Sequence, residues 1–65
     1  MPPHQSPSRA LSVVAASGVP RRDIATSLGI STATLNRRLS GASPFNADEL
    51  VGLANILGIK PSELL

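Results

Sequence analysis

Residues 23–41, DIATSLGISTATLNRRLSG, contain two short apolar-periodic runs that are separated by a single glycine. Gly29 follows the first run, where a glycine can adopt the left-handed conformation that ends a helix. Ser31 precedes the second run, where its hydroxyl can accept a hydrogen bond from the first helical turn. Gly41 follows that second run in the same way. The segment therefore predicts two helices joined by a tight turn.

The same signals for helix starts and helix ends recur along the 65-residue chain. They predict an all-α fold, a compact bundle of five short helices. Strand-like alternation is absent, and the β-branched residues are scattered rather than clustered. The start of the chain is rich in Pro and Ser, which predicts a disordered N-terminal arm at 1–7 and one domain at 8–65. The expected helices are 8–17, 20–28, 31–40, 46–57 and 61–65.

Acidic residues distinguish the helix at 31–40 from its neighbours. Three other predicted helices carry an acid at the third helical position, where a carboxylate can bond back to the cap and complement the helix dipole. The helix at 31–40 has Thr34 there, and residues 24–47 include no Asp or Glu. Its positive end is open to a phosphate or an acceptor-rich base edge, although Ser31 alone could cap it adequately. The three acids are Asp23, Glu49 and Glu63.

The helix at 31–40 also has two different faces. With about 100° between successive residues, Leu35 and Leu39 share one face and a polar stripe occupies the other. An asparagine and an arginine in that stripe are side chains that bind adenine and guanine edges bidentately, and Arg38 on the flank is better placed for a phosphate. A polar stripe and C-terminal arginines are equally typical of any surface helix. The stripe consists of Ala33, Asn36, Arg37 and Ser40.

From about residue 19 to residue 65 the chain resembles the helix-turn-helix domain of the Cro/C1-type repressor family, also called the XRE family. One departure is Arg38, because the family often has an apolar or aromatic residue there. The resemblance implies a lambda-repressor-like bundle in which helices 2 and 3 form the helix-turn-helix. The matching positions are Ala25, Gly29, Ile30, Ser31, Leu35 and Gly41, and then Pro44–Phe45, Glu49–Leu50, Leu53–Ala54, Leu57–Gly58 and Glu63–Leu64.

The resemblance implies sequence-specific binding of a double-stranded DNA operator by a transcription regulator, most simply a repressor of the Cro-like or immunity-repressor-like phage type. The helix at 31–40 would enter the major groove, and the preceding helix would point its N-terminus toward phosphate. Two arginines at that N-terminus oppose the helix dipole, which a nearby phosphate would explain, unless Asp23 neutralises them sufficiently. The implied DNA-binding residues are Arg21, Arg22, Ser31, Thr32, Ala33, Thr34, Asn36, Arg37, Arg38 and Ser40.

Composition disfavours several other classes of protein. The net charge is +2 and the sequence pI is about 10.6, which mildly favours an anionic partner. The absence of cysteine and the single His4 argue against a disulfide, a metal site and an activated nucleophile, so we expect no enzyme, no cofactor and no small-molecule ligand. No signal peptide or membrane-spanning stretch is evident. We therefore expect a cytoplasmic, nucleoid-associated protein of a bacterial or phage-infected cell.

Two further expectations concern partners and packing. An antitoxin or another protein-interaction module on the same fold is the alternative function. As a DNA-binding protein the chain should be a monomer or weak homodimer that pairs on DNA, with any dimer using Leu64 and Leu65. The expected inward-facing residues are Leu11, Val14 and Ala15 in the first helix and Leu50, Leu53, Ala54 and Leu57 in the fourth.

Overall fold

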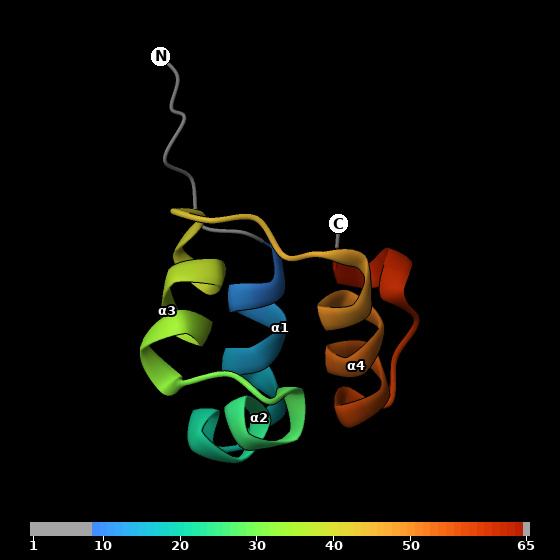
Figure 1. Cartoon of the computed structure of the whole chain (residues 1–65). Coiled ribbons are helices and arrows are strands. Elements are labelled where there is room, and N and C mark those ends of the chain that lie inside the picture. The colour runs from blue at the N-terminus through green and yellow to red at the C-terminus, as the bar shows by residue number, and fades with distance from the viewer. Residues whose placement is uncertain (1–8, 65) are drawn as a thin grey trace.

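The computed structural model describes residues 9–64, which form four α-helices followed by one short 3-10 helix (Figure 1). The all-α prediction is confirmed, but the fifth predicted helix is a single 3-10 turn rather than an α-helix. The predicted arm at 1–7 and Leu65 lie outside the described residues. The elements are α1 (Arg9–Ser17), α2 (Arg21–Leu28), α3 (Thr32–Ser40), α4 (Ala47–Leu57) and η1 (Pro61–Leu64).

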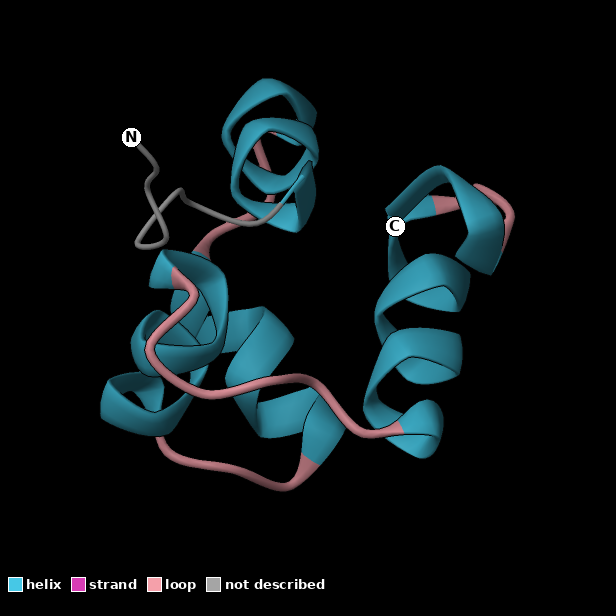
Figure 2. Cartoon of the chain, turned by 90° about the horizontal axis from the view of Figure 1, so that it is seen from above, coloured by secondary structure: helices cyan, strands magenta, loops and turns pink. Residues whose placement is uncertain are grey.

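The helices pack around one shared core. α2 contacts both α3 and α4, while α1 contacts α3 and η1, and η1 also packs on α4. Seen from above, the helices surround the position of that core, and loops link them at the outside (Figure 2). Because α3 is held from one side by α1 and α2, its opposite side is free to face solvent.

The turn between α2 and α3 depends on Gly29. Its φ is +73° and its ψ is 26°, in the left-handed region. The Gly29 N–H donates to the carbonyl oxygen of Thr26 at 3.1 Å, and the Ile30 N–H donates to that of Ala25 at 3.0 Å. These two bonds satisfy the last carbonyls of α2 and direct the chain into α3. Apart from Gly29 and its two chain neighbours, no residue has an atom within 4 Å of where a Cβ would be, so the position requires a particular conformation rather than space.

Gly29→Ala should therefore destabilise the fold by about 1 kcal/mol, since the left-handed region is less favourable by about that free energy for a non-glycine L-residue. Gly29→Asn should cost less, because asparagine tolerates this conformation better. Urea unfolding of the two variants beside the wild type measures both effects. Equal stability of all three proteins would show that the turn does not require the left-handed conformation.

α2 and α4 approach each other closely at Gly52. A Cβ built on this residue would lie 2.7 Å from the Leu28 Cδ2 atom, well inside van der Waals contact. The missing side chain of Gly52 thus makes room for the last residue of α2. This contact packs the end of α2 against α4.

The core confirms most of the predicted inward-facing residues and corrects one. Ala15 is exposed, and Ala10 is fully buried in its place. The buried stripe of α1 follows Ala10 and Val14 because these residues face α3 and η1, whereas the apolar pattern of α1 fits more than one rotation. Leu11, Leu50 and Leu57 are partly buried. The buried apolar residues are Ala10, Val14, Ile24, Ala25, Leu35, Leu39, Leu53, Ala54 and Leu64.

The burial of Leu64 corrects its part in the expected dimer surface, whereas Leu65 lies outside the described residues. Its exposed fraction is 3%, because η1 folds back against α1 and α4. Leu64 therefore contributes to the core of its own chain and offers no apolar patch to a second copy. Within residues 9–64 the exposed large apolar residue is Val51, on α4.

Candidate nucleic-acid interface

The predicted facing of α3 is confirmed by its burial pattern. Leu35 and Leu39 are 0% exposed and anchor the helix in the core. The residues of the opposite stripe, Ala33, Asn36, Arg37 and Ser40, are all exposed. Burial on one side fixes the rotation of α3, so the polar stripe must face outward as a unit.

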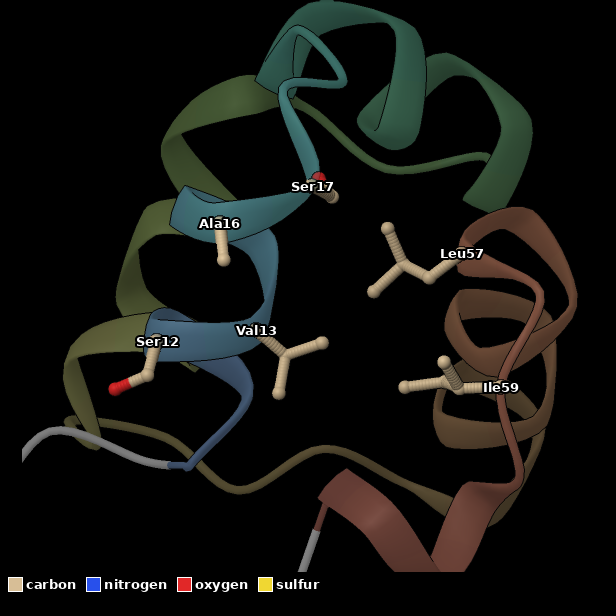
Figure 3. A pocket seen from close by; sticks show the side chains of 6 residues that line it. All are labelled: Ser12, Val13, Ala16, Ser17, Leu57 and Ile59. Carbon is tan, nitrogen blue, oxygen red and sulfur yellow. The ribbon is translucent and has the colours of Figure 1, made fainter.

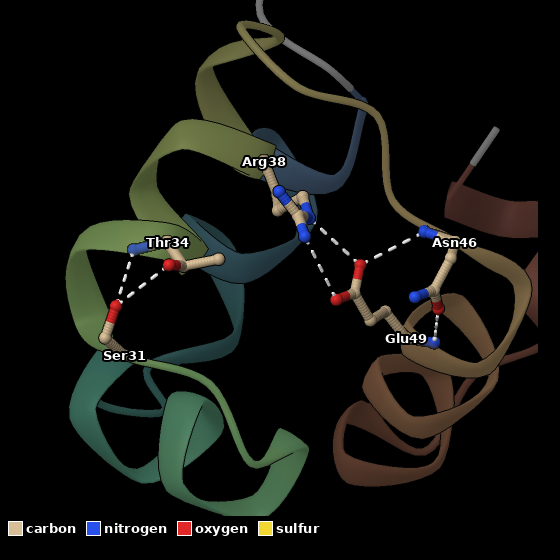
Figure 4. A network of polar contacts seen from close by, with 5 residues as sticks. All are labelled: Ser31, Thr34, Arg38, Asn46 and Glu49. Atoms are coloured by element: carbon tan, nitrogen blue, oxygen red, sulfur yellow. Dashed lines mark hydrogen bonds and ion pairs between the residues drawn. The ribbon is translucent and has the colours of Figure 1, made fainter.

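The N-terminus of α3 has a hydroxyl cap and no acidic residue. Ser31 Oγ accepts a hydrogen bond from the Thr34 N–H at 3.0 Å and donates to Thr34 Oγ1 at 2.9 Å (Figure 4). The first turn of α3 contains no Asp or Glu. The amides of Thr32 and Ala33 have no intrahelical acceptor, because the first N–H groups of a helix lack one. This end of α3 is therefore electropositive and suited to an anion.

The last turn of α3 carries two arginines with different surroundings. Arg37 is exposed, and no side chain among residues 9–64 forms an ion pair or hydrogen bond with its guanidinium. Ser40 Oγ donates to the Arg37 carbonyl oxygen at 3.0 Å, which satisfies one terminal acceptor of the helix. The Arg37 charge therefore remains available to a partner.

Arg38, in contrast, is already paired. Its Nε donates to Glu49 Oε1 at 3.0 Å and a terminal nitrogen donates to Glu49 Oε2 at 3.4 Å (Figure 4). The two side chains are 23% and 10% exposed. Arg38 thus extends across to α4 instead of joining the exposed stripe, and it ties the C-terminal half of α3 to the start of α4.

Glu49 also closes the N-terminus of α4. Its Oε1 accepts from the Asn46 N–H at 3.1 Å, and its own N–H donates to Asn46 Oδ1 at 2.7 Å, which completes a capping box. The cap predicted at this position is confirmed. Hydrogen bonds from Arg38 and from the Asn46 backbone hold the pKa of the Glu49 carboxyl below its ordinary value, although burial acts in the opposite direction.

The Arg38–Glu49 pair was not predicted from the sequence. The two residues are 11 positions apart and belong to different helices, so helical periodicity does not relate them. One signal could have suggested the pair: Asp48 and Glu49 are the first acids after the acid-free stretch at 24–47. Which of the two acids meets Arg38 depends on how α4 is rotated against α3.

Two predicted DNA-binding residues, one on α2 and one on α3, contact each other. A terminal nitrogen of Arg21, the first residue of α2, donates to Asn36 Oδ1 at 2.9 Å. Arg22 is exposed and forms no side-chain hydrogen bond or ion pair within residues 9–64. The structure therefore brings α2 and α3 together through a polar contact on the exposed side.

Asp23 does not close the N-terminus of α2. The residue before α2 is Pro20, which has no N–H, so Asp23 cannot bond back to the cap as predicted. At η1 the same prediction holds, because Glu63 Oε2 accepts from the Lys60 N–H at 2.9 Å. Both arginines at the start of α2 are exposed, and the Asp23 carboxylate forms no hydrogen bond or ion pair with either of them.

A second surface feature is lined by apolar and hydroxyl side chains. An open hollow of about 380 Å³ separates α1 from the end of α4 (Figure 3), and its lining has no titratable side chain. Within residues 9–64 no cluster of His, Cys, Asp and Glu could hold a metal ion, and no helix is long and apolar enough to cross a membrane. The lining residues are Ser12, Val13, Ala16, Ser17, Leu57 and Ile59.

Comparison with protein families gives one finding that bears on this surface. A family model described as helix-turn-helix matches residues 14–64, which include all of α2, α3, α4 and η1. Comparisons with curated proteins and with solved structures return no match. The matched region covers most of the chain and contains the exposed stripe of α3, all of α2 and the second half of α1.

Proposed function

The chain belongs to the Cro/C1-type helix-turn-helix (XRE) family of DNA-binding transcription regulators, and on this premise we propose that it recognises a specific sequence of double-stranded DNA through α3. The observation that carries the proposal is the two-sided character of α3. Leu35 and Leu39 hold one face in the core, while the other face presents only small, amide, guanidinium and hydroxyl side chains. The major groove is about 12 Å wide, and no bulky side chain on this face would keep a helix out of it.

The contacts follow from the positions of the exposed groups. The electropositive N-terminus of α3, with Ser31, Thr32 and Ala33, faces bases or the adjoining phosphates. The Arg37 guanidinium, which has no side-chain partner within residues 9–64, hydrogen-bonds a base edge, for which guanine offers two acceptors. Arg22, at the start of α2, binds phosphate. Arg38 is left out of this set because Glu49 already neutralises it.

Arg37→Ala should weaken binding to the preferred duplex by about 1–3 kcal/mol and relax the preference at one or two base pairs. Arg22→Ala should instead weaken binding to all duplexes alike and make the dependence of log affinity on log salt shallower by about one unit. Binding of each variant to duplexes selected from a random library, at several salt concentrations, measures both effects. Both side chains are exposed, so neither change should alter folding.

These outcomes differ sharply from those of an interaction module. If the wild-type protein shows no sequence preference, or if both variants keep its affinity and its ranking of duplexes, then α3 is not a DNA-recognition helix. Retention of ranking by Arg22→Ala alone is the expected behaviour of a phosphate contact.

We further propose that the protein acts as a repressor, because a protein that occupies an operator excludes others from the same DNA. One short helix contacts few base pairs, so two copies should bind adjacent half-sites about one helical turn apart. With Leu64 buried, the free chain should be a monomer that pairs on DNA. The repressor role is tested separately from the pairing. A transcription reporter with the selected operator in its promoter should lose expression when the protein is present.

The pairing is tested by sedimentation of the free protein and by titration onto duplexes with one and two half-sites. We expect a monomer in solution and a higher affinity per half-site on the longer duplex, since the first bound copy raises the effective concentration of the second. A tight dimer without DNA, or equal affinity per half-site on both duplexes, contradicts this assembly.

A further inference from the structure

The contact between Arg21 and Asn36 joins the helix that approaches the phosphates to the helix that approaches the bases. Arg21 donates to Asn36 Oδ1 at 2.9 Å across 15 positions of sequence, and both side chains are exposed. Neither residue contributes to the core, since α2 and α3 are anchored there by Ile24, Ala25 and Leu35. We therefore expect loss of this contact to leave folding intact and to change only the exposed surface.

Chemistry determines which way the Asn36 amide points in this contact. A guanidinium has five N–H donors and no acceptor, so the atom that faces Arg21 must be the carbonyl oxygen. The Asn36 amino group, which forms no other hydrogen bond within residues 9–64, is left to donate outward. Together the pair presents N–H donors and a positive charge, with one of the two acceptor sites on Oδ1 occupied.

Base edges differ in how well they match such a surface. In the major groove, guanine presents two acceptors, N7 and O6, whereas adenine presents the N7 acceptor and the N6 amino donor. An unconstrained asparagine binds adenine bidentately because its carbonyl oxygen accepts from N6. With Arg21 bound to that oxygen, the adenine amino group meets a partly occupied acceptor, whereas the acceptors of guanine meet the free Asn36 amino group.

We propose that Arg21 is a positioning residue that acts through Asn36 and shifts the preference at one base pair from adenine toward guanine. The proposal rests on DNA recognition by α3, as set out above. It assigns Arg21 a part in sequence specificity, which a residue that bound only phosphate would not have.

The experiment uses Arg21→Ala, Asn36→Ala, the double variant and Arg22→Ala as a matched control. Arg22 is the neighbouring exposed arginine on α2 and makes no contact with Asn36. Each protein is titrated onto duplexes selected with the wild type, in which every position is replaced in turn by each base pair. The measured quantity is the guanine-to-adenine affinity ratio at each position, with thermal unfolding as the check on folding.

We expect Arg21→Ala to lower this ratio at one position by about fivefold, a typical size for coupling between contacting residues. Asn36→Ala should remove the preference at the same position, and adding Arg21→Ala to it should not change the ratio further. Arg22→Ala should leave every ratio at its wild-type value.

The positioning role is overturned if Arg21→Ala weakens all duplexes by one common factor, or if its effect on the ratio persists in the Asn36→Ala background. These results leave the proposed function intact, because the wild type still ranks duplexes by sequence. A wild type with no ranking at all would instead reject DNA recognition by α3 and this inference with it.

Discussion

Leu35→Ala should unfold most of the protein at 37 °C. Leu35 is 0% exposed and lies on the buried face of α3, opposite the polar stripe. Truncation of a fully buried leucine costs about 2–5 kcal/mol, through lost apolar contact and the cavity that remains. The free energy of unfolding of a domain of this size is only about 3–5 kcal/mol, so the loss from one such cavity is close to the whole of it. Circular dichroism during thermal unfolding measures the loss directly.

Thr32→Ala is the matched control, since Thr32 lies on the same helix but is exposed. This variant should unfold close to the wild-type temperature, because surface substitutions usually change stability by less than about 0.5 kcal/mol. If Leu35→Ala unfolds at the same temperature as Thr32→Ala, then α3 is not anchored by this residue and its outward face has been misassigned.

Glu49→Gln should be the second most damaging change, with a loss of about 2 kcal/mol. Glutamine keeps an oxygen for the Asn46 N–H, but it removes the charge that holds the Arg38 guanidinium. Hydrogen bonds to charged groups contribute about 1.5–3 kcal/mol, and here both side chains are mostly buried. Asp48→Asn is the control, because Asp48 is an exposed acid in the same first turn. It should lose no more than a few tenths of a kcal/mol.

The same pair makes stability depend on pH in a definite direction. The pKa of the Glu49 carboxyl is lowered in the folded protein, so the folded state binds this proton less readily than the unfolded chain. The stabilisation is fully present above the unfolded pKa of about 4.3 and is lost as pH falls through the lower, folded pKa. The stability difference between wild type and Glu49→Gln should therefore shrink in acid.

Urea unfolding of wild type and Glu49→Gln from pH 7 down to pH 2.5 tests both points. A difference that stays constant across this range would mean that the Glu49 charge does not stabilise the fold. A difference absent at pH 7 would mean that Arg38 finds an equally good partner in water.

The sequence by itself determined where the helices begin and end. Gly29, Gly41 and Gly58 follow apolar runs, and all three adopt positive φ at helix ends in the structure. Ser31 and Asn46 cap the helices that they precede. These signals depend on residues within one or two turns of each other, so local backbone chemistry is sufficient to produce them. The facing of α3 was predictable for the same reason, because Leu35 and Leu39 form one unambiguous buried side.

Tertiary structure decided how these helices are rotated and which polar groups meet. α1 buries Ala10 rather than Ala15 because α3 and η1 select one of the rotations that its apolar pattern permits. The partners of Arg38 and Arg21 lie 11 and 15 positions away, on helices whose relative placement no local pattern encodes. Each contact needs two side chains to converge after packing has fixed the backbone, and for this reason the pairs that constrain the α3 surface could not be predicted from its sequence.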